Sequence, residues 1–412
     1  MKKRIQMSVD MSYGTASLLP GLPAAATWNC DILQALLVVG YLTTPPRYRG
    51  ISLSTYWAWL RYGAAISTRR SSLRLRPIWN ELDPHQKTIL SDDFGLGFPC
   101  QYLVEQHGFE DFADTVYLLD SLLAGVVSHA TRSKRGPSKT PDLIGVDSLG
   151  RLHVLECKGS QTSRAALDDA LGRGIAQKRN LSNGSIFASC MVAGIFVPQD
   201  RSAEEAQLVF IDPDPDPALK LLQGLDPKVI ERAVRRQSLA KALGTAGLWA
   251  AAGSVASGRV SPAEADFVRD LESGELRFNN FDKTEEETWR KTIEYRSLET
   301  DLKDEADRMA YVTRLVIDIP DDVVRRVGSI VGQTGAVSFH DLDAWLAERL
   351  VRERSIKIRT LASRTKDEGK LVSRRRSVTS AWTMSSVEGD LETASISVSS
   401  GIRFRIERQR FA

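Results

Sequence analysis

Residues 140–159 read TPDLIGVDSLGRLHVLECKG, and this stretch decides the fold because it predicts a β-hairpin with charged residues inside it. The apolar runs 143–146 and 152–155 have the composition of strands. Between them, residues 148–150 form a short Gly-containing segment of the kind that closes a hairpin. We therefore expect two antiparallel strands joined by a three-residue loop.

Two carboxylates meet across this expected hairpin. Pairing Asp147 with Arg151 across the loop and counting outward places Asp142 opposite Glu156. Because side chains alternate along a strand, Lys158 lies on the same face as Glu156. Like charges directly opposite each other are destabilising, and a carboxylate among apolar neighbours is costly unless it is paired or binds a metal. The pattern predicts a cation at this point.

The residues favour a divalent cation as that partner. Lys158 neutralises one carboxylate, and the remaining charge and free oxygens suit Mg²⁺, which prefers oxygen ligands. The carbonyl of Cys157, between Glu156 and Lys158, offers a further oxygen. The alternative interpretation is an exposed hairpin on which Glu156 and Lys158 form a surface ion pair.

Pro141-Asp142 followed by Glu156-Cys157-Lys158 after a hairpin resembles the PD-(D/E)XK nuclease superfamily, which has the restriction-endonuclease-like fold. The resemblance covers only the stretch quoted above. It implies that Asp142 and Glu156 hold Mg²⁺, for which Mn²⁺ is expected to substitute. It also implies that Lys158 orients or activates the water that attacks a phosphodiester.

The resemblance implies a core of helix, three strands, helix and strand, and the sequence after the hairpin matches it. Residues 163–181 predict a helix that begins at a Ser163 cap, with Leu167, Leu171 and Ile175 on one face. Residues 189–197 and 207–211 predict buried strands. On the helix, Gln177 resembles a glutamine that relatives place beside the active site; the alternative is a Gln that faces solvent.

Upstream of the hairpin the match to that core is looser. Residues 93–108 predict the first helix, although Pro99 interrupts the pattern. The family's additional acidic residue is then Glu105 or Glu110. Between this helix and Pro141, the only candidate for the missing strand is 124–129.

Composition restricts the class of protein. The chain has 412 residues, of which 42% are hydrophobic and 26% charged, as expected for an ordinary soluble protein of two or three domains. Four cysteines without a Cys-x-x-Cys pair argue against a disulfide scaffold or a structural zinc site, and fit the cytoplasm. The first residues lack the apolar core of a signal peptide. The longest apolar run, 32–42, is too short to span a membrane and predicts a buried helix.

Basic residues gather in three places, although the net charge is only +3. Residues 57–79 interleave arginines with aromatic side chains, and the tail from Val351 carries an excess of Lys and Arg. A third group lies immediately before the hairpin and contains Arg132, Lys134, Arg135 and Lys139. Each group taken alone is commonly a solvated face or linker. Together with the hairpin they favour nucleic acid as the partner.

The Asp-Pro repeat at 212–217 marks a boundary. We expect an N-terminal region at 1–90, a nuclease-like core at 91–217 and a C-terminal region at 218–412. The fold class is α/β, a mixed sheet flanked by helices. The C-terminal region is expected to be mostly helical, including a helix at 338–353, but with a strand at 312–319 and two short strands within 394–406.

The sequence therefore predicts a Mg²⁺-dependent nuclease, with the two outer regions selecting the substrate or partner. DNA is the favoured polymer because the resembled family mostly cuts DNA. Endonuclease and exonuclease activity, defence and repair, and a partner protein or a second copy of the chain are all left open. The alternatives are a non-catalytic nucleic-acid-binding or scaffold protein with this fold, and a metal-dependent hydrolase of a small phosphoester.

Overall fold

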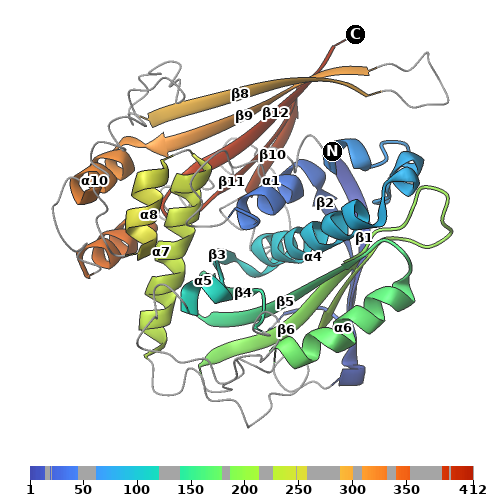
Figure 1. The fold of residues 1–412 in the computed structure, drawn as a ribbon, viewed down its shortest axis with the longest axis horizontal. Helices are drawn as coiled ribbons and strands as arrows, with labels where there is room; N and C mark the ends of the chain where they lie inside the picture. The colour runs from blue at the N-terminus through green and yellow to red at the C-terminus, as the bar shows by residue number, and fades with distance from the viewer. Residues whose placement is uncertain are drawn as a thin grey trace, which may run out of the picture.

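The computed structural model describes residues 1–13, 19, 21–44, 62–119, 140–178, 186–212, 226–246, 248–257, 288–299, 309–331, 340–352, 383–388 and 391–411. Within these residues the chain forms a seven-stranded mixed sheet and a five-stranded antiparallel sheet. Figure 1 shows two helices, α1 (Ile32–Leu42) and α4 (Pro84–His107), lying between the two sheets. No helix of the described part is long and apolar enough to cross a membrane.

The expected hairpin is present with the predicted register. Strands β4 (Leu143–Asp147) and β5 (Leu152–Ser160) are antiparallel, and Leu143 pairs with Leu155. Asp147 closes the turn, because its Oδ1 accepts hydrogen bonds from the backbone N–H groups of Leu149 and Arg151, each at 2.9 Å. Gly150 adopts a φ of 75°, a left-handed conformation that favours glycine.

The seven-stranded sheet has the order β2-β1-β7-β6-β5-β4-β3. The remaining strands are β1 (Lys2–Val9), β2 (Ala25–Asp31), β3 (Phe109–Asp114), β6 (Phe187–Phe196) and β7 (Gln207–Ile211). The predicted strands at 189–197 and 207–211 are confirmed as β6 and β7. The strand before the hairpin is β3, directly after α4, and the predicted location 124–129 lies outside the described residues. The α/β class, with helices flanking a mixed sheet, is confirmed.

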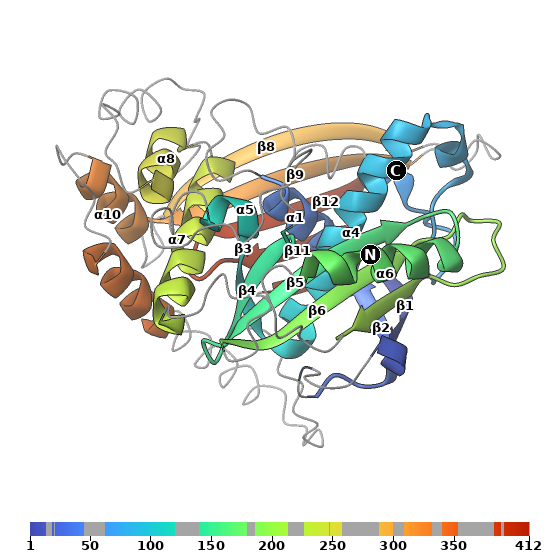
Figure 2. The same cartoon turned by 60° about the horizontal axis from the view of Figure 1, so that its bottom comes forward.

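Two pairs in this sheet, β5–β6 and β1–β7, are parallel, and the other pairs are antiparallel. A parallel pair needs a crossover, and α6 (Arg164–Lys178) supplies it between β5 and β6. This helix begins where it was predicted, since Ser163 Oγ accepts from Ala166 N at 3.1 Å. Leu167 and Leu171 are buried against β6 and β7, as their spacing predicted. Figure 2 shows α6 and α4 on opposite faces of the sheet.

Helix α4 is longer than the sequence predicted. It begins at Pro84 rather than at residue 93, because Asp83 caps it by accepting from Gln86 N at 3.1 Å. It ends at Gly108, which has a φ of 67°. Pro99 lies inside the helix without ending it.

The N-terminal residues belong to the same sheet as the hairpin. Strand β1 pairs with β7, and β2 pairs with β1. Helix α1, predicted from its apolar run, is buried along its whole length and packs against α4. The expected boundary between residues 90 and 91 falls inside α4, so residues on both sides of it share one core.

The described part of the C-terminal region is mixed α and β, with a larger sheet than the mostly helical expectation included. The second sheet has the order β10-β11-β12-β9-β8. Its strands are β8 (Thr288–Glu299), β9 (Met309–Pro320), β10 (Thr383–Glu388), β11 (Leu391–Ser397) and β12 (Arg403–Phe411). The predicted strands at 312–319 and within 394–406 lie in β9, β11 and β12. Strand β8 was not predicted, because charged residues are interspersed among its β-branched and aromatic ones.

Helices also contribute to this region. They are α7 (Pro227–Thr245), α8 (Trp249–Ser257), α10 (Asp321–Val331) and a helix over residues 340–352 that confirms the one predicted at 338–353. The second sheet packs on α1, where the rings of Tyr41 and Phe404 lie 5.8 Å apart. One continuous hydrophobic cluster joins α1, α4 and this sheet.

Buried charges attach α7 to β3, the edge strand of the first sheet. Lys241, fully buried, lies 2.6 Å from Asp114 Oδ2 and donates to the carbonyl of Leu42 at 2.7 Å. One turn earlier, Ser238 Oγ donates to Asp111 Oδ1 at 2.6 Å, and Arg235 donates to Asp111 Oδ2 at 2.7 Å. These bonds join the C-terminal region to the sheet that contains the hairpin.

We expect Lys241→Met to lower the free energy of unfolding by about 3 kcal/mol, because it leaves the Asp114 carboxylate without its cation. Urea denaturation measures the change. Lys228→Met on the same helix is the matched control: Lys228 is 67% exposed, and its pair with Glu231 should contribute less than about 1 kcal/mol. Equal losses in the two variants would show that the buried pair does not hold α7 in place.

Candidate active site

The backbone pairing of β4 with β5 ends at Leu143–Leu155, and beyond this pair the side chain of Asp142 makes the next hydrogen bond to β5. The Oδ2 atom of Asp142 accepts the backbone N–H of Cys157 at 2.7 Å. The carbonyl of Asp142 accepts from Thr115 N at 3.1 Å, which ties the residue to the end of β3. Asp142 is thereby held beside Glu156, as the register predicted.

Glu156 and Lys158 project from the same face of β5, toward α6. The side chain of Glu156 is fully buried, and its Oε1 accepts a hydrogen bond from Lys158 Nζ. Lys158 is 22% exposed and connects this buried group to the surface. The alternative of a surface ion pair is therefore contradicted by the burial of Glu156.

Helix α6 reaches this pair because residue 174 is a glycine. A Cβ at Gly174 would lie 3.1 Å from Glu156 Cγ, 3.4 Å from Lys158 Cε and 2.8 Å from Val192 Cγ1. A larger residue would push the helix away from the sheet. Gln177 lies on the last turn of the same helix, three residues after Gly174, and the structure does not describe its side chain.

The pKa values show that the site has too little positive charge. Burial, and then the neighbouring Asp142, raise the pKa of Glu156 to about 8. Burial also raises the pKa of Asp142, against the hydrogen bond from Cys157 and the charge of Lys158. Burial alone would lower the pKa of Lys158, but Glu156 and Asp142 raise it above its ordinary value. Lys158 therefore stays charged, and because one cation lies beside two carboxylates, Glu156 keeps its proton up to a pH of about 8 when no metal is bound.

The oxygens present fit a bound Mg²⁺. The second oxygen of Glu156, Oε2, is buried and has no hydrogen-bond partner among the described residues. In a strand the N–H and C=O of one residue point to the same side, so the Cys157 carbonyl faces Asp142. The described residues contain no group of three or more His, Cys, Asp or Glu side chains suited to a metal. Mg²⁺ needs no such group, because it keeps several waters and is held through one or two carboxylates.

The thiol of Cys157 is no part of this oxygen set. It belongs to the hydrophobic cluster on the α4 side of the sheet, and its pKa is raised well above the ordinary value by contact with Cys100 and by burial. Only the backbone of Cys157 faces Asp142.

Neither acidic residue predicted upstream joins the site. Glu105 accepts from Trp28 Nε1 at 2.7 Å, and Glu110 pairs with Arg235 at 3.3 Å. The carboxylate that the sequence reasoning missed is Asp92. The charge of Lys158 lowers the pKa of Asp92 against a larger opposing effect of burial, and Asp92 in turn raises the pKa of Asp142.

Asp92 was missed because the predicted helix began at residue 93. In the structure, the early turns of α4 cross β5 at very short range. A Cβ on Gly159 would lie 1.7 Å from the carbonyl oxygen of Ser91, and one on Gly95 would lie 2.6 Å from Gly159 N. The paired glycines were the signal that could have placed Asp92 near Lys158.

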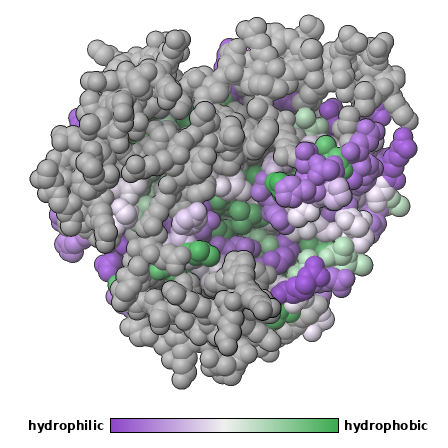
Figure 3. All heavy atoms as spheres, viewed as in Figure 1, coloured by the Kyte–Doolittle hydropathy of each residue, from purple (hydrophilic) through white to green (hydrophobic). Residues whose placement is uncertain are grey.

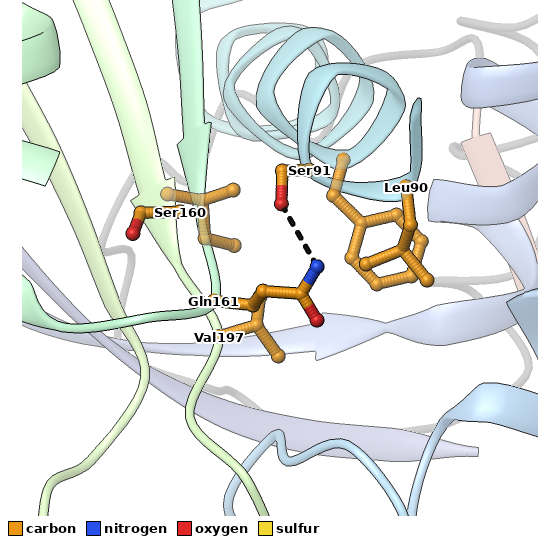
Figure 4. A pocket seen from close by; sticks show the side chains of 7 residues that line it. Leu90, Ser91, Ser160, Gln161 and Val197 are labelled. Atoms are coloured by element: carbon orange, nitrogen blue, oxygen red, sulfur yellow. Dashed lines mark hydrogen bonds between the residues drawn. The ribbon is translucent and has the colours of Figure 1, made fainter. Parts of the chain in front are cut away.

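A small pocket lies just beyond this crossing, at the end of β5. It is a shallow depression without room for an enclosed water, and it is lined by Leu90, Ser91, Phe94, Ser160, Gln161, Ile195 and Val197. Figure 4 shows Gln161 pointing toward Ser91, to which its Nε2 donates at 3.3 Å. A second bond, to the carbonyl of Lys87 at 2.7 Å, makes Gln161 a tie between β5 and α4.

The structure describes only part of the three basic groups found in the sequence. Arg132, Lys134, Arg135 and Lys139 lie outside the described residues, as does most of the tail. Within 57–79, where arginines interleave with aromatic residues, the structure describes only residues 62–79. Tyr62 and Trp79 are buried, and Arg74 is buried and donates to the carbonyl of Ser202 at 2.6 Å.

Arg69 and Arg70 of the same segment remain exposed. The right-hand side of Figure 3, where the chain leads into α4, is mainly hydrophilic. In the described residues 62–79, charge is therefore exposed while the aromatic rings of Tyr62 and Trp79 are buried.

Comparison with known proteins gives no match, whether to a protein-family model, to a curated protein or to a solved structure. A functional assignment for this chain therefore rests on the geometry and chemistry of the site.

In metal-free buffer, we expect the free energy of unfolding to fall as the pH rises from about 5 to about 8. The pKa of Glu156 is about 8 in the folded protein, above the ordinary value near 4.5, so the folded state binds the proton more tightly and loses that advantage on deprotonation. The contribution of Glu156 is on the order of 5 kcal/mol, since each pKa unit corresponds to about 1.4 kcal/mol.

Denaturant titrations in EDTA at several pH values measure this fall. Glu156→Gln should flatten the pH dependence, whereas Glu204→Gln, at an exposed position, should leave it as in the wild type. A Glu156→Gln curve parallel to that of the wild type would contradict the assignment.

Proposed function

We propose that this chain is a Mg²⁺-dependent nuclease that hydrolyses phosphodiester bonds in nucleic acid, with DNA as the favoured polymer. The observation that carries the proposal is the buried Glu156, whose Oε2 has no hydrogen-bond partner among the described residues and which lies beside a second carboxylate, Asp142, and a charged Lys158. Stabilisation of the fold does not require this arrangement, because two adjacent carboxylates with one cation are costly.

The order of elements around the site supports a restriction-endonuclease-like core. Helix α4 is followed by the antiparallel strands β3, β4 and β5, then by α6 and by β6 parallel to β5. This is the series of helix, three strands, helix and strand that the resemblance implies. The N-terminal strands β1 and β2 extend the same sheet beyond β7.

The residues that would hold the cation are Asp142, Glu156 and the carbonyl of Cys157, and the carboxylate of Asp92 lies close enough to influence Asp142 and Lys158. When bound, Mg²⁺ polarises a scissile phosphate and lowers the pKa of a coordinated water. The buried position of Glu156 excludes competing water and strengthens electrostatic interactions at the site.

Lys158 has the position of a group that acts on the reacting atoms. Its ammonium is held beside Glu156 by a hydrogen bond, and its charge is maintained by both carboxylates. Because 22% of the side chain is exposed, a phosphate arriving from solvent can meet it. A positioned donor of this kind stabilises charge that develops on the water or the phosphate oxygens. The preference for DNA rests on the family resemblance of the hairpin.

We expect Asp142→Asn and Glu156→Gln each to lower Mg²⁺-dependent cleavage of DNA by at least about 100-fold, since each removes a proposed ligand of the cation. Initial rates on labelled duplex and single-stranded DNA measure the effect, with Mn²⁺ and EDTA as further conditions. Asp168→Asn, on the far flank of α6 beside Arg164, is the control and should cut as the wild type does.

The same experiment separates the proposal from the non-catalytic alternative. A scaffold protein would bind DNA equally with and without Mg²⁺ and never cut it. A wild-type protein that shows this behaviour, or an Asp142→Asn protein that cuts at the wild-type rate, would overturn the proposed function. Circular dichroism and thermal melting establish that each variant is folded.

At saturating Mg²⁺, we expect Lys158→Met to lower the cleavage rate by about 10² to 10³, the loss typical of one transition-state donor. If Lys158 served only as a counter-ion, its removal would strengthen Mg²⁺ binding and leave the saturated rate nearly unchanged. Calorimetric Mg²⁺ titration and single-turnover rates distinguish the two. A Lys158→Met rate within a few-fold of the wild type would show that Lys158 serves only as a counter-ion to the carboxylates.

A further inference from the structure

The two arginines within the described length of α6 lie on opposite flanks of the helix. Arg164 and Arg173 are nine positions apart, which corresponds to about two and a half turns. Arg164 donates from Nη1 to Gln207 Oε1 on β7, and from Nε to Asp168 at 2.9 Å. The flank of Arg164 therefore faces the β7 side of the sheet.

Arg173 consequently lies on the flank toward β5 and β4. The strand order β7-β6-β5-β4 places these strands on the side away from Gln207. The next residue, Gly174, is the one whose Cβ position contacts Glu156 and Lys158. The backbone of Arg173 is thus one residue from the closest approach of α6 to the candidate active site.

Arg173 is exposed and has no hydrogen bond or ion pair within the part of the chain that the structure describes. Asp169, one turn earlier, is also exposed and forms no salt bridge with it. The orphan oxygen of Glu156 is buried under α6, so Arg173 does not serve as the missing counter-ion. An Arg on this flank is directed to solvent at the rim of the site.

We propose that Arg173 binds a backbone phosphate of the nucleic acid next to the phosphodiester that is cleaved. The proposal rests on the proposed nuclease function and specifies how the site grips its substrate. A guanidinium binds phosphate through two parallel hydrogen bonds, and it keeps its charge at any working pH. Lys158 then contacts the scissile phosphate while Arg173 binds an adjacent phosphate, so the nucleic-acid backbone runs along the flank of α6.

The test compares Arg173→Gln with the wild type in the full-length protein. Binding to a fluorescent DNA duplex is measured by anisotropy over a range of NaCl concentrations, with Ca²⁺ in place of Mg²⁺ to suppress cleavage. Loss of one phosphate contact should reduce the slope of log affinity against log salt by about 0.9. In Mg²⁺, KM should rise while kcat stays within a few-fold of the wild type.

Two further variants sharpen the result. Arg325→Gln, at an exposed position on α10 in the other part of the molecule, carries the same charge change and should leave the slope and KM unchanged. Arg173→Lys should keep the wild-type salt slope but raise KM, because lysine keeps the charge and loses the paired hydrogen bonds.

The outcomes are distinguishable. If the wild type binds and cuts DNA while Arg173→Gln has the same salt slope and KM, the phosphate contact is refuted and the nuclease function stands. An equal loss in Arg325→Gln would reduce the effect to overall charge and would also refute the contact. A wild type that binds neither duplex nor single-stranded DNA would overturn both proposals.

Discussion

The crossing of α4 over β5 is the contact on which the rest of the structure depends. Side chains of ordinary size keep a helix well away from a strand, but at Gly159 a single added carbon would collide with the carbonyl of Ser91. The crossing positions Asp92 near Lys158 on one side and brings Cys100 to Cys157 on the other. The same short contact lets a helix on one face of the sheet influence charges that project from the opposite face.

The hairpin carries two buried carboxylates, Asp147 and Glu156, whose environments differ in the number of donors around them and in the neighbouring negative charge. At the turn, Asp147 receives hydrogen bonds from two backbone N–H groups and from Arg151, and His153 lies 3.3 Å away. These donors outweigh burial and lower the pKa of Asp147 to about 2. At the other end, burial and the charge of Asp142 outweigh the hydrogen bond from Lys158, and the pKa of Glu156 rises to about 8. The fold thus surrounds Asp147 at the turn with hydrogen-bond donors, whereas Glu156 would be stabilised in its charged form by a further cation.

The C-terminal region contacts the sheet of the hairpin mainly through α7, and it contacts the N-terminal region mainly through α1. The N-terminal strands widen the first sheet, and α1 follows them directly to lie under the second sheet. Helix α7 is bound to β3 through the pairs Lys241–Asp114 and Ser238–Asp111. Thr115, directly after β3, donates its backbone N–H to the carbonyl of Asp142. A continuous series of polar contacts therefore connects the C-terminal region to the candidate site.

The sequence by itself determined the hairpin, its register and the proximity of Asp142 to Glu156, because strand pairing and a short turn follow from local patterns. It also determined α1, α6, β6 and β7, whose apolar spacing or capping residues are read within a single segment. Only the tertiary structure decided that Asp92, and neither Glu105 nor Glu110, lies near Lys158. That choice depends on how far α4 extends and where it crosses β5, and both are set by contacts between residues distant in sequence. Strand β8 of the second sheet was missed for the same physical reason, since it is a strand by virtue of its pairing with β9 and not of any apolar run of its own.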